Sequence, residues 1–155
     1  MRLVKPDDME VSIIKSVLAY QFDYKVAEAL VALDDLFVEY SRRGRIKYVY
    51  RGRERILTRR PTDGLFTLSI EAGRIVAANS STPRFRVIVE KGYTPLGGVL
   101  ARHLVDVDPN LRPGDEVIIV DTNDNLIGVG KLRLPPLIAK NTIVGEVARV
   151  RKKVP

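Results

Sequence analysis

The stretch Leu111–Gly130 (LRPGDEVIIVDTNDNLIGVG) constrains the fold of this chain more than any other. After a Pro-Gly-Asp break, Val117–Val120 is apolar at four consecutive positions, as expected of a strand that is covered on both faces. The polar segment Thr122–Asn125 has the residues of a turn. In the second strand, Gly128 and Gly130 alternate, which indicates a bulge, a tight bend or the close approach of another backbone. The sequence therefore predicts a hairpin that belongs to a small β-barrel.

The positive charge of the chain is concentrated in one segment, residues 42–60. The whole chain carries a formal net charge of +7, from 26 Lys or Arg and 19 Asp or Glu. Residues 42–60 hold nine basic residues and one acid, Glu54, whereas the rest of the chain holds 17 basic and 18 acidic residues. Such a concentration of positive charge predicts a polyanionic partner. The alternative interpretation is a solvated basic face.

Helices followed by strands are predicted for the first half of the chain. Residues 7–33 have the apolar spacing of helices, and Asp7 and Glu10 form a pattern like a capping box. Strands are predicted at residues 36–40, 45–51, 53–58 and 65–70, and a helical turn at 75–78. If the second and third strands pair, five basic side chains are expected on one open sheet face, where guanidinium groups suit phosphate. These side chains are Arg45, Lys47, Arg51, Arg53 and Arg55.

The polar segment Asn79–Pro83 ends in proline and predicts a domain boundary. Beyond it, a strand is predicted at residues 84–90, with Phe85, Val87 and Val89 pointing inward. Thr94-Pro95 predicts the start of a helix over Leu96–His103, although Gly97-Gly98 in its first turn is unfavourable. The glycine pair indicates either the close approach of another backbone or a frayed helix end. A loop is expected at residues 134–136 and a last strand at residues 145–154.

The sequence offers little for catalysis or metal binding. The chain has one histidine, His103, and no cysteine, so neither a thiolate zinc site nor a Cys–His pair can be assembled. It also has no nucleophile elbow and no phosphate-binding loop with a lysine. Asp106 and Asp108 would share a strand face, which suits a hard cation, but positions at a strand edge leading to Pro109 are the favoured interpretation. We expect no cofactor and no metal, and we do not expect His103 to act as a general base.

No apolar run approaches the length of a membrane span, and the N-terminus lacks the apolar core of a signal peptide. Together with the absence of cysteine, these features predict a cytoplasmic protein without a membrane partner.

The second half of the chain resembles a PUA domain, an RNA-binding module. The resemblance rests on an ordered series of segments over residues 84–152, namely VIVEKG, VDVDPNLRPGDEVIIVD, LIGVG and GEVARVR. The first half, with RIKYVYRGRERILTRRPTDGLFTLSIEAG and YQFDY upstream of it, is similar to the domain that precedes PUA in archaeosine tRNA-guanine transglycosylases. The resemblance covers nearly the whole chain but does not include the catalytic barrel of those enzymes.

The resemblance implies a mixed β pseudo-barrel that binds structured RNA, often a stem or the acceptor end of tRNA. In the family, the contact surface usually includes the first helix, its glycine-containing turn and the last strand. The corresponding positions here are Gly97, Gly98, Arg102, His103, Arg149, Arg151 and Lys152. Members often have a Gly-basic-Ser sequence where this chain has Leu96-Gly97-Gly98, so the glycine alignment differs by a residue or two.

The sequence therefore predicts an α+β protein with two domains. Residues 1–79 are expected to form a helix-plus-antiparallel-sheet domain, and residues 80–155 a PUA-like mixed β pseudo-barrel. The expected function is the binding of structured RNA, foremost tRNA, without catalysis, in a protein of archaeal type. Two other functions fit the sequence. One is an accessory subunit of an enzyme that modifies tRNA or rRNA and has a separate catalytic subunit, and the other is an interaction module for an acidic protein.

Overall fold

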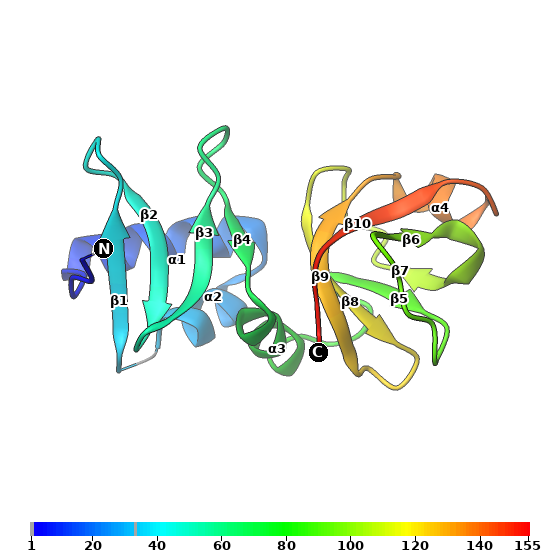
Figure 1. Ribbon diagram of the computed structural model, residues 1–155, viewed down its shortest axis with the longest axis horizontal. Helices are drawn as coiled ribbons and strands as arrows, with labels where there is room; N and C mark the ends of the chain where they lie inside the picture. The colour runs from blue at the N-terminus through cyan, green and yellow to red at the C-terminus, as the bar shows by residue number, and fades with distance from the viewer. Residues whose placement is uncertain (1, 33) are drawn as a thin grey trace. The chain divides into compact units, whose positions relative to one another are not determined.

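The computed structural model describes residues 2–32 and 34–155, and the chain forms two compact units, Met1–Asn79 (unit 1) and Ser80–Pro155 (unit 2). Both combine helices with a β-sheet (Figure 1). The predicted α+β class and the mixed pseudo-barrel in the second half are confirmed. Among the described residues, no helix is both long and apolar enough to cross a lipid bilayer.

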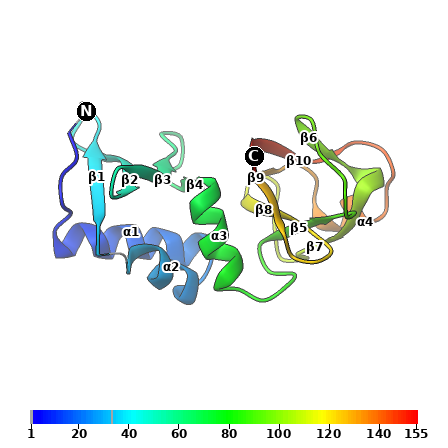
Figure 2. The same ribbon diagram turned by 60° about the horizontal axis from the view of Figure 1, so that its bottom comes forward.

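Unit 1 is a four-stranded antiparallel sheet with helices on one face. Its strands lie in the order β1-β2-β3-β4, and α1 and α2 pack below the sheet in Figure 2. No described element of unit 1 covers the opposite face. The elements are α1 (Asp8–Gln21), α2 (Tyr24–Val31), β1 (Leu36–Tyr40), β2 (Ile46–Arg51), β3 (Glu54–Arg59), β4 (Phe66–Leu68) and α3 (Ile70–Ala78).

The start of α1 is fixed by the predicted capping box. The Asp7 carboxylate accepts a hydrogen bond from the Glu10 N–H at 2.8 Å, and the Asp7 N–H donates to Glu10 Oε1 at 3.0 Å. Two of the four amides that a helix leaves without a partner at its start are commonly satisfied in this way. Ile14 and Leu18 on the inner face of α1 are almost fully buried. Leu33, the last position of the predicted helical stretch, lies outside the described residues.

Replacing Asp7 with Ala is expected to destabilise α1 by about 1 kcal/mol, because the cap of the helix is lost. Amide hydrogen exchange of α1, followed by NMR, measures this free energy directly. Lys5→Ala is the matched control, since Lys5 is an exposed side chain just before the helix. Equal protection of α1 in both variants would show that the capping box contributes nothing.

Two predicted elements of unit 1 have different bounds in the structure. The predicted strand at residues 65–70 is limited to β4, and the predicted helical turn at 75–78 is the end of the longer α3. The boundary lies at Ser69, whose Oγ accepts a hydrogen bond from the Ala72 N–H at 3.1 Å and so caps α3. Serine is favoured at this position because its side chain accepts a hydrogen bond from an N–H group in the first turn of the helix.

Unit 2 is a six-stranded mixed sheet that curls around one apolar core, with strand order β6-β10-β9-β8-β5-β7 (Figure 1). Only the β5–β8 pair is parallel among the described strand pairs. The elements are β5 (Arg86–Val89), β6 (Gly98–Leu100), the 3₁₀ turn η1 (Ala101–His103), β7 (Leu104–Val107), β8 (Glu116–Asp121), β9 (Leu126–Leu132), α4 (Pro136–Lys140) and β10 (Glu146–Lys153).

The predicted hairpin is β8 and β9, at the centre of this sheet. Every residue of β8 is buried, as expected of a strand covered on both faces. Gly130 is required by the close approach of β10, because a Cβ atom there would lie 2.0 Å from the carbonyl oxygen of Arg149. At Gly128 the corresponding distance, to the Lys152 carbonyl oxygen, is 2.5 Å. The close approach of another backbone, one of the three alternatives predicted for these glycines, is confirmed.

The predicted helix over Leu96–His103 is wrong. Residues 98–100 form the edge strand β6, which pairs with β10, and only the short turn η1 follows. Gly98 lies against β10 so closely that a Cβ atom would be 1.8 Å from Glu146 Oε1. Pairing with a strand almost 50 positions later therefore overrides the local Thr-Pro signal. The loop expected at residues 134–136 leads into α4, which begins at Pro136 and was not predicted.

Candidate nucleic-acid interface

The predicted basic residues of unit 1 lie at two different ends of its sheet. The β1–β2 and β3–β4 connections are at one end, and the β2–β3 turn is at the other (Figure 1). Arg45 and Lys47 are at the first end, and Arg51 and Arg53 at the second. At about 3.3 Å per residue, the length of β2 keeps these pairs well apart. The prediction of one sheet face carrying all five basic side chains is also wrong, because the register of β2 and β3 puts Arg51 and Arg55 on opposite faces.

The register of β2 and β3 separates the remaining basic residues further. A bulge shifts the pairing near Tyr50, so that Arg55 lies opposite Tyr50, and Arg51 opposite Glu54. Since opposite residues of an antiparallel pair share a face, Arg55 is on the uncovered face, where its guanidinium carbon lies 4.5 Å from the centre of the Tyr48 ring. Arg51 instead forms ion pairs with Glu71 at 3.4 Å and Asp35 at 4.0 Å.

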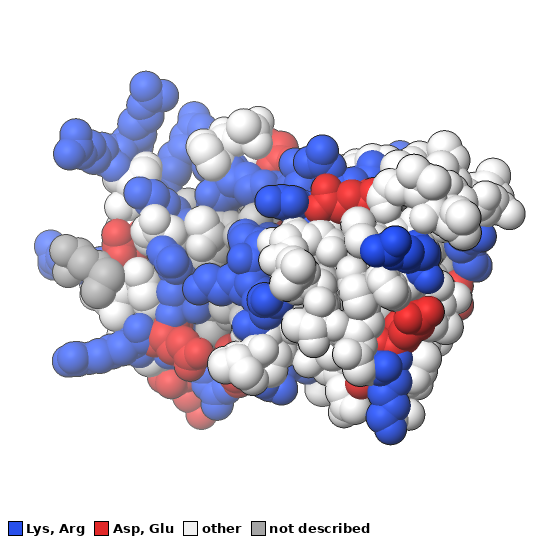
Figure 3. Space-filling view, turned by 45° about the vertical axis from the view of Figure 1, so that its right-hand side comes forward, with Lys and Arg blue, Asp and Glu red and all other residues white. Residues whose placement is uncertain are grey.

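A cleft of about 450 Å³ opens at the end of unit 1 that carries the β1–β2 and β3–β4 connections. Five cationic side chains line this cationic cleft: Arg42, Arg43, Arg45, Lys47 and Arg59. No carboxylate is among its described lining residues, which are completed by Ser41, Ile46 and Pro61. Lys and Arg side chains project along this upper edge of unit 1 in Figure 3. The lining of the cleft therefore has the charge that suits an anionic group.

The cationic cleft contains residues that the sequence did not single out. Arg42 and Arg43 belong to a turn, and Arg59 to the end of β3, so local alternation does not connect them with Arg45 and Lys47. The order of the four strands is what brings these residues together. In an up-and-down sheet, the first and third connections lie at the same end, and residues 41–45 and 60–65 are those connections.

An apolar cavity of about 280 Å³ adjoins the cationic cleft and shares Arg45, Ile46 and Arg59 with it. Most of its other lining comes from α1, β4 and β1, with Ile13, Ile14, Val17, Phe66 and Tyr40. Glu10 is the one carboxylate among its described lining residues, and it accepts a short hydrogen bond from the Tyr40 hydroxyl. This hydrogen bond raises the pKa of Tyr40 to about 12.

The hydrogen bond between Tyr40 and Glu10 predicts a late-titrating tyrosine. The raised pKa favours the neutral phenol in the folded state, so this contribution to stability is present below pH 10 and is lost as the pH rises towards about 12. Ultraviolet titration of the six tyrosines is expected to show a component near pH 12 that Tyr40→Phe removes. Tyr20→Phe is the control, because Tyr20 is 81% exposed. Retention of the component in Tyr40→Phe would contradict the assignment.

In unit 2 the predicted glycines lie beside one of the predicted arginines. A Cβ atom on Gly97 would lie 3.5 Å from Arg149 Nη1, and the Gly97 carbonyl oxygen accepts a hydrogen bond from the Val150 N–H at 3.0 Å. Gly98 pairs with Arg149 across the strands. Arg149 is exposed and forms an ion pair with Glu146 at 3.2 Å. The structure thus brings Gly97, Gly98 and Arg149 together.

The other predicted residues of unit 2 have varied surroundings. Arg151 forms two contacts with the buried carboxylate of Glu116, one of them at 2.9 Å, whereas Lys152 is exposed. The His103 ring stacks on Tyr93 with centroids 4.1 Å apart, and its Nδ1 lies 3.0 Å from Glu90 Oε2. Exposed Arg102 lies beside it, with Nε 3.4 Å from His103 Nε2. His103 is therefore held in place by its neighbours.

The carboxylates considered for a cation have separate structural partners. Asp106 forms an ion pair with Lys140 at 2.9 Å, and this contact lowers the pKa of Asp106. Asp108 accepts hydrogen bonds from the backbone N–H groups of Phe85 at 2.8 Å and Asn110 at 3.0 Å. Within residues 2–32 and 34–155, no group of three or more His, Cys, Asp or Glu is arranged to hold a metal ion.

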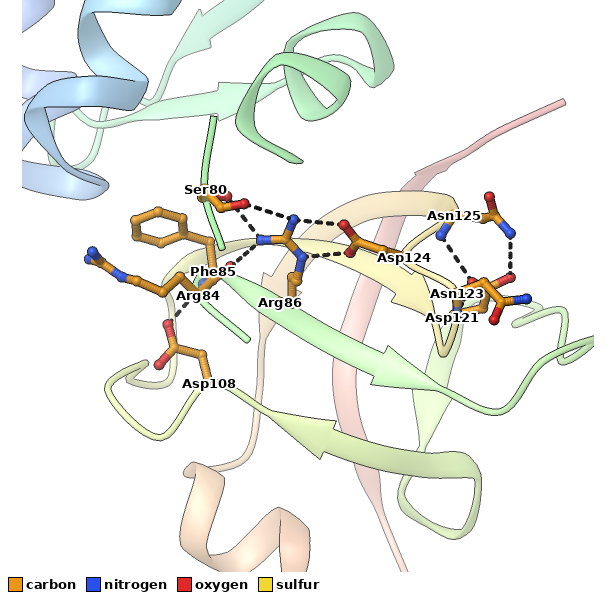
Figure 4. Close-up of polar contacts among 9 residues, drawn as sticks. All are labelled: Ser80, Arg84, Phe85, Arg86, Asp108, Asp121, Asn123, Asp124 and Asn125. Carbon is orange, nitrogen blue, oxygen red and sulfur yellow. Dashed lines mark hydrogen bonds and ion pairs between the residues drawn. The ribbon is translucent and has the colours of Figure 1, made fainter. Parts of the chain in front are cut away.

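The sequence did not predict that Arg86 is fully buried. Phe85, Val87 and Val89 are buried as predicted, but Arg86, between them, has no exposed surface. Its guanidinium donates to both carboxylate oxygens of Asp124, at 2.7 and 3.0 Å (Figure 4). It also donates to Ser80 Oγ and to the Arg84 carbonyl oxygen, each at 2.9 Å. Arg86 therefore ties the start of unit 2 to the β8–β9 turn.

Comparison with known families assigns both units. Residues 12–83 match the family described as the patch-forming domain C2 of tRNA-guanine transglycosylase, and residues 86–154 match the PUA domain family. The chain consists of a C2 domain followed by a PUA domain. Unit 1 is the C2 domain and unit 2 the PUA domain, in the order that the sequence resemblance predicts.

Archaeal relatives share the two domains over most of this chain. The tRNA-guanine(15) transglycosylase of Methanothermobacter thermautotrophicus is 33% identical over 144 residues, which are 90% of this chain and 22% of the relative. That of Thermococcus onnurineus is 35% identical over 156 residues, 97% of this chain and 26% of the relative. The chain thus spans about a quarter of the length of these tRNA-modifying relatives.

Solved structures share the fold of the whole chain. A hypothetical protein from Pyrococcus horikoshii has a TM-score of 0.72 at 17% identity, covering 99% of this chain and 93% of its own. A conserved PUA domain protein from Thermoplasma acidophilum has a TM-score of 0.65, also at 17% identity, covering 98% of this chain and 92% of its own. At this level of identity, the similarity concerns the fold.

Proposed function

We propose that this protein binds structured RNA, foremost tRNA, and takes no part in catalysis itself. The observation that carries the proposal is the cationic cleft of the C2 domain, with five Lys or Arg side chains and no described carboxylate in its lining. The presence of a PUA domain and the similarity to tRNA-guanine(15) transglycosylases support RNA as the polyanion.

The proposed contacts fall into two groups. In the C2 domain, the cations of the cleft hold phosphates, and Arg55, stacked on Tyr48, offers a cation and an aromatic ring on the uncovered sheet face. Arg53, in the β2–β3 turn, is a further proposed phosphate contact. Arg51 is held in place by its ion pairs with Asp35 and Glu71. Phosphate contacts of this kind determine how the RNA is positioned.

In the PUA domain, the proposed contacts are backbone and polar groups around Gly97 and Gly98, with Arg149 beside them, and the exposed side chains of Arg102 and Lys152. The Arg149 guanidinium packs against Gly97, so it offers a cation beside partly exposed backbone. His103 and Arg151, which have partners in the fold, support this surface. Shape and exposed ends of RNA are recognised through groups of this kind.

The test is a fluorescence-anisotropy titration of labelled tRNA at about 150 mM salt, near physiological ionic strength. Unstructured RNA of equal length is the competitor. We expect tRNA to bind at least about tenfold more tightly, a difference of about 1.4 kcal/mol in binding free energy. Equal affinity for the two RNAs would contradict shape recognition. Saturable binding of an acidic protein, with no RNA binding, would select the protein-interaction alternative.

One observation favours a second function: the chain matches about a quarter of the length of tRNA-modifying enzymes. In this proposal the protein is an accessory subunit that presents tRNA or rRNA to a separate catalytic subunit. Size-exclusion chromatography of the protein with a candidate catalytic chain, with and without tRNA, tests it. A complex that forms supports the accessory role, and separate elution under both conditions opposes it.

A further inference from the structure

The cationic cleft and the apolar cavity of the C2 domain adjoin each other and differ in chemistry. They share Arg45, Ile46 and Arg59, so a ligand in one of them touches the wall of the other. The cleft volume of about 450 Å³ falls in the usual range of sites for small molecules, about 300 to 1,000 Å³. A ligand that fits both carries an anionic group at one end and a flat apolar group at the other.

Hydrogen bonds and close packing hold the backbone around the site before any ligand binds. Ser41 Oγ accepts hydrogen bonds from the N–H groups of Arg43 and Arg45, both at 3.3 Å, and the Ser41 N–H donates to the Arg45 carbonyl oxygen at 2.7 Å. On the other side, Gly64 makes room for Arg59, because a Cβ atom there would lie 2.9 Å from Arg59 Nη2. Cations carried by an ordered backbone lose less entropy when they bind an anion than cations on a disordered loop.

The charges also orient such a ligand. The nearby carboxylate of Asp63 forms an ion pair with Arg60 at 2.9 Å, so it does not neutralise the cleft. Glu10 lines the apolar cavity and not the cationic cleft. An anionic group is therefore favoured in the cleft, where five cations meet no described carboxylate. The apolar wall of the cavity, formed by side chains such as Ile13, Val17 and Phe66, is left to an uncharged ring.

We propose that this composite site holds one unpaired nucleotide of the bound RNA. The phosphate lies among Arg45, Arg59 and their neighbours, and the base lies against Ile46 and the apolar wall of α1. The inference rests on the proposed RNA binding. It goes further because a paired, stacked base cannot enter a concave site, whereas a bulged nucleotide can place its base and its phosphate there together.

The test uses two RNA hairpins that differ by one bulged nucleotide. The wild-type protein is expected to bind the bulged hairpin about tenfold more tightly, the effect of about 1.4 kcal/mol from one buried base and its phosphate. The double substitution Arg45→Gln, Arg59→Gln is expected to abolish this preference. The double substitution Arg42→Gln, Arg43→Gln changes the exposed turn and leaves Arg59 in place. It is expected to reduce the preference for the bulged hairpin but not to abolish it. The control double substitution Arg53→Gln, Arg55→Gln is expected to lower the affinity for both hairpins equally and to keep the preference for the bulged one.

A second readout identifies the source of the nucleotide. With isoleucine methyl groups labelled for NMR, the bulged hairpin is expected to shift the Ile13 and Ile46 signals, and the plain hairpin is not. A free nucleoside 5′-monophosphate is expected to shift the same signals only weakly, and inorganic phosphate leaves them unchanged. Tight binding of the free nucleotide without any preference for the bulge would overturn the proposal in favour of a free ligand.

The outcomes separate this inference from the proposed function. If both hairpins bind with equal affinity and the methyl signals do not move, RNA binding stands and the nucleotide site is refuted. If neither hairpin binds, both proposals fail. A preference for the bulge that survives Arg45→Gln, Arg59→Gln also refutes the site, because the bulge is then recognised elsewhere.

Discussion

Raising the salt concentration from about 50 to 200 mM is expected to weaken tRNA binding about a thousandfold, with a slope of log affinity against log salt of roughly −5. The reason is the release of counterions when about five or six phosphates are neutralised. The structure provides five cations in the cationic cleft, and the exposed Lys152 in the PUA domain. Anisotropy titrations at four or more salt concentrations measure the slope.

Charge-neutral variants assign the slope to the cleft. Arg45→Gln combined with Lys47→Gln is expected to make the slope shallower by about two, since each phosphate contact contributes about one. Lys25→Gln combined with Arg74→Gln removes the same charge from exposed positions on α2 and α3 and is expected to leave the slope unchanged. Equal effects of the two double variants would mean that net charge alone drives binding.

Replacing Asp124 with Ala is expected to destabilise the PUA domain by about 3 to 5 kcal/mol, although the Asp124 side chain is 42% exposed. The large effect arises at Arg86, which has no exposed surface and would lose the carboxylate that neutralises it. Amide hydrogen exchange of the buried strand β8, followed by NMR, reports the stability of this domain separately from that of the C2 domain.

Two further variants show whether the buried charge is the cause. Asn123→Ala is the matched control in the same turn, because only the backbone N–H of Asn123 is used, in a hydrogen bond to Asp121 Oδ1 at 2.9 Å. It is expected to change stability by no more than about 0.5 kcal/mol. The double variant Arg86→Met, Asp124→Ala is expected to be more stable than Asp124→Ala alone, because no unpaired charge remains. A double variant that is less stable would contradict this explanation.

The parts of the fold that local sequence determines were predictable. The β8–β9 hairpin follows from a β-branched run, a polar turn and two alternating glycines, and the start of α1 from Asp7 and Glu10. What failed depends on distant partners. Residues 98–100 form a strand and not a helix because β6 pairs with β10. Arg86 can be buried because its guanidinium pairs with Asp124, which is 38 positions away in the sequence.

The candidate site was predictable in composition but not in shape. The basic segment 42–60 was evident, and its residues do surround a cationic cleft. Strict alternation put Arg51 and Arg55 on one face, whereas the bulge beside Tyr50 separates them. Arg59 joins the cleft through the order of the strands, which no local pattern in the sequence reveals.

The most direct test of the account is to map tRNA on the isotope-labelled protein by NMR, residue by residue. We predict that amide signals change at residues 41–47 and 59–64 of the C2 domain and, in the PUA domain, around Gly97 and along β10. Signals of the exposed apolar residues Leu137 and Ile143 are predicted to stay in place. Changes confined to those apolar residues, with none at the cationic cleft, would contradict the proposal that this protein binds RNA through its basic end.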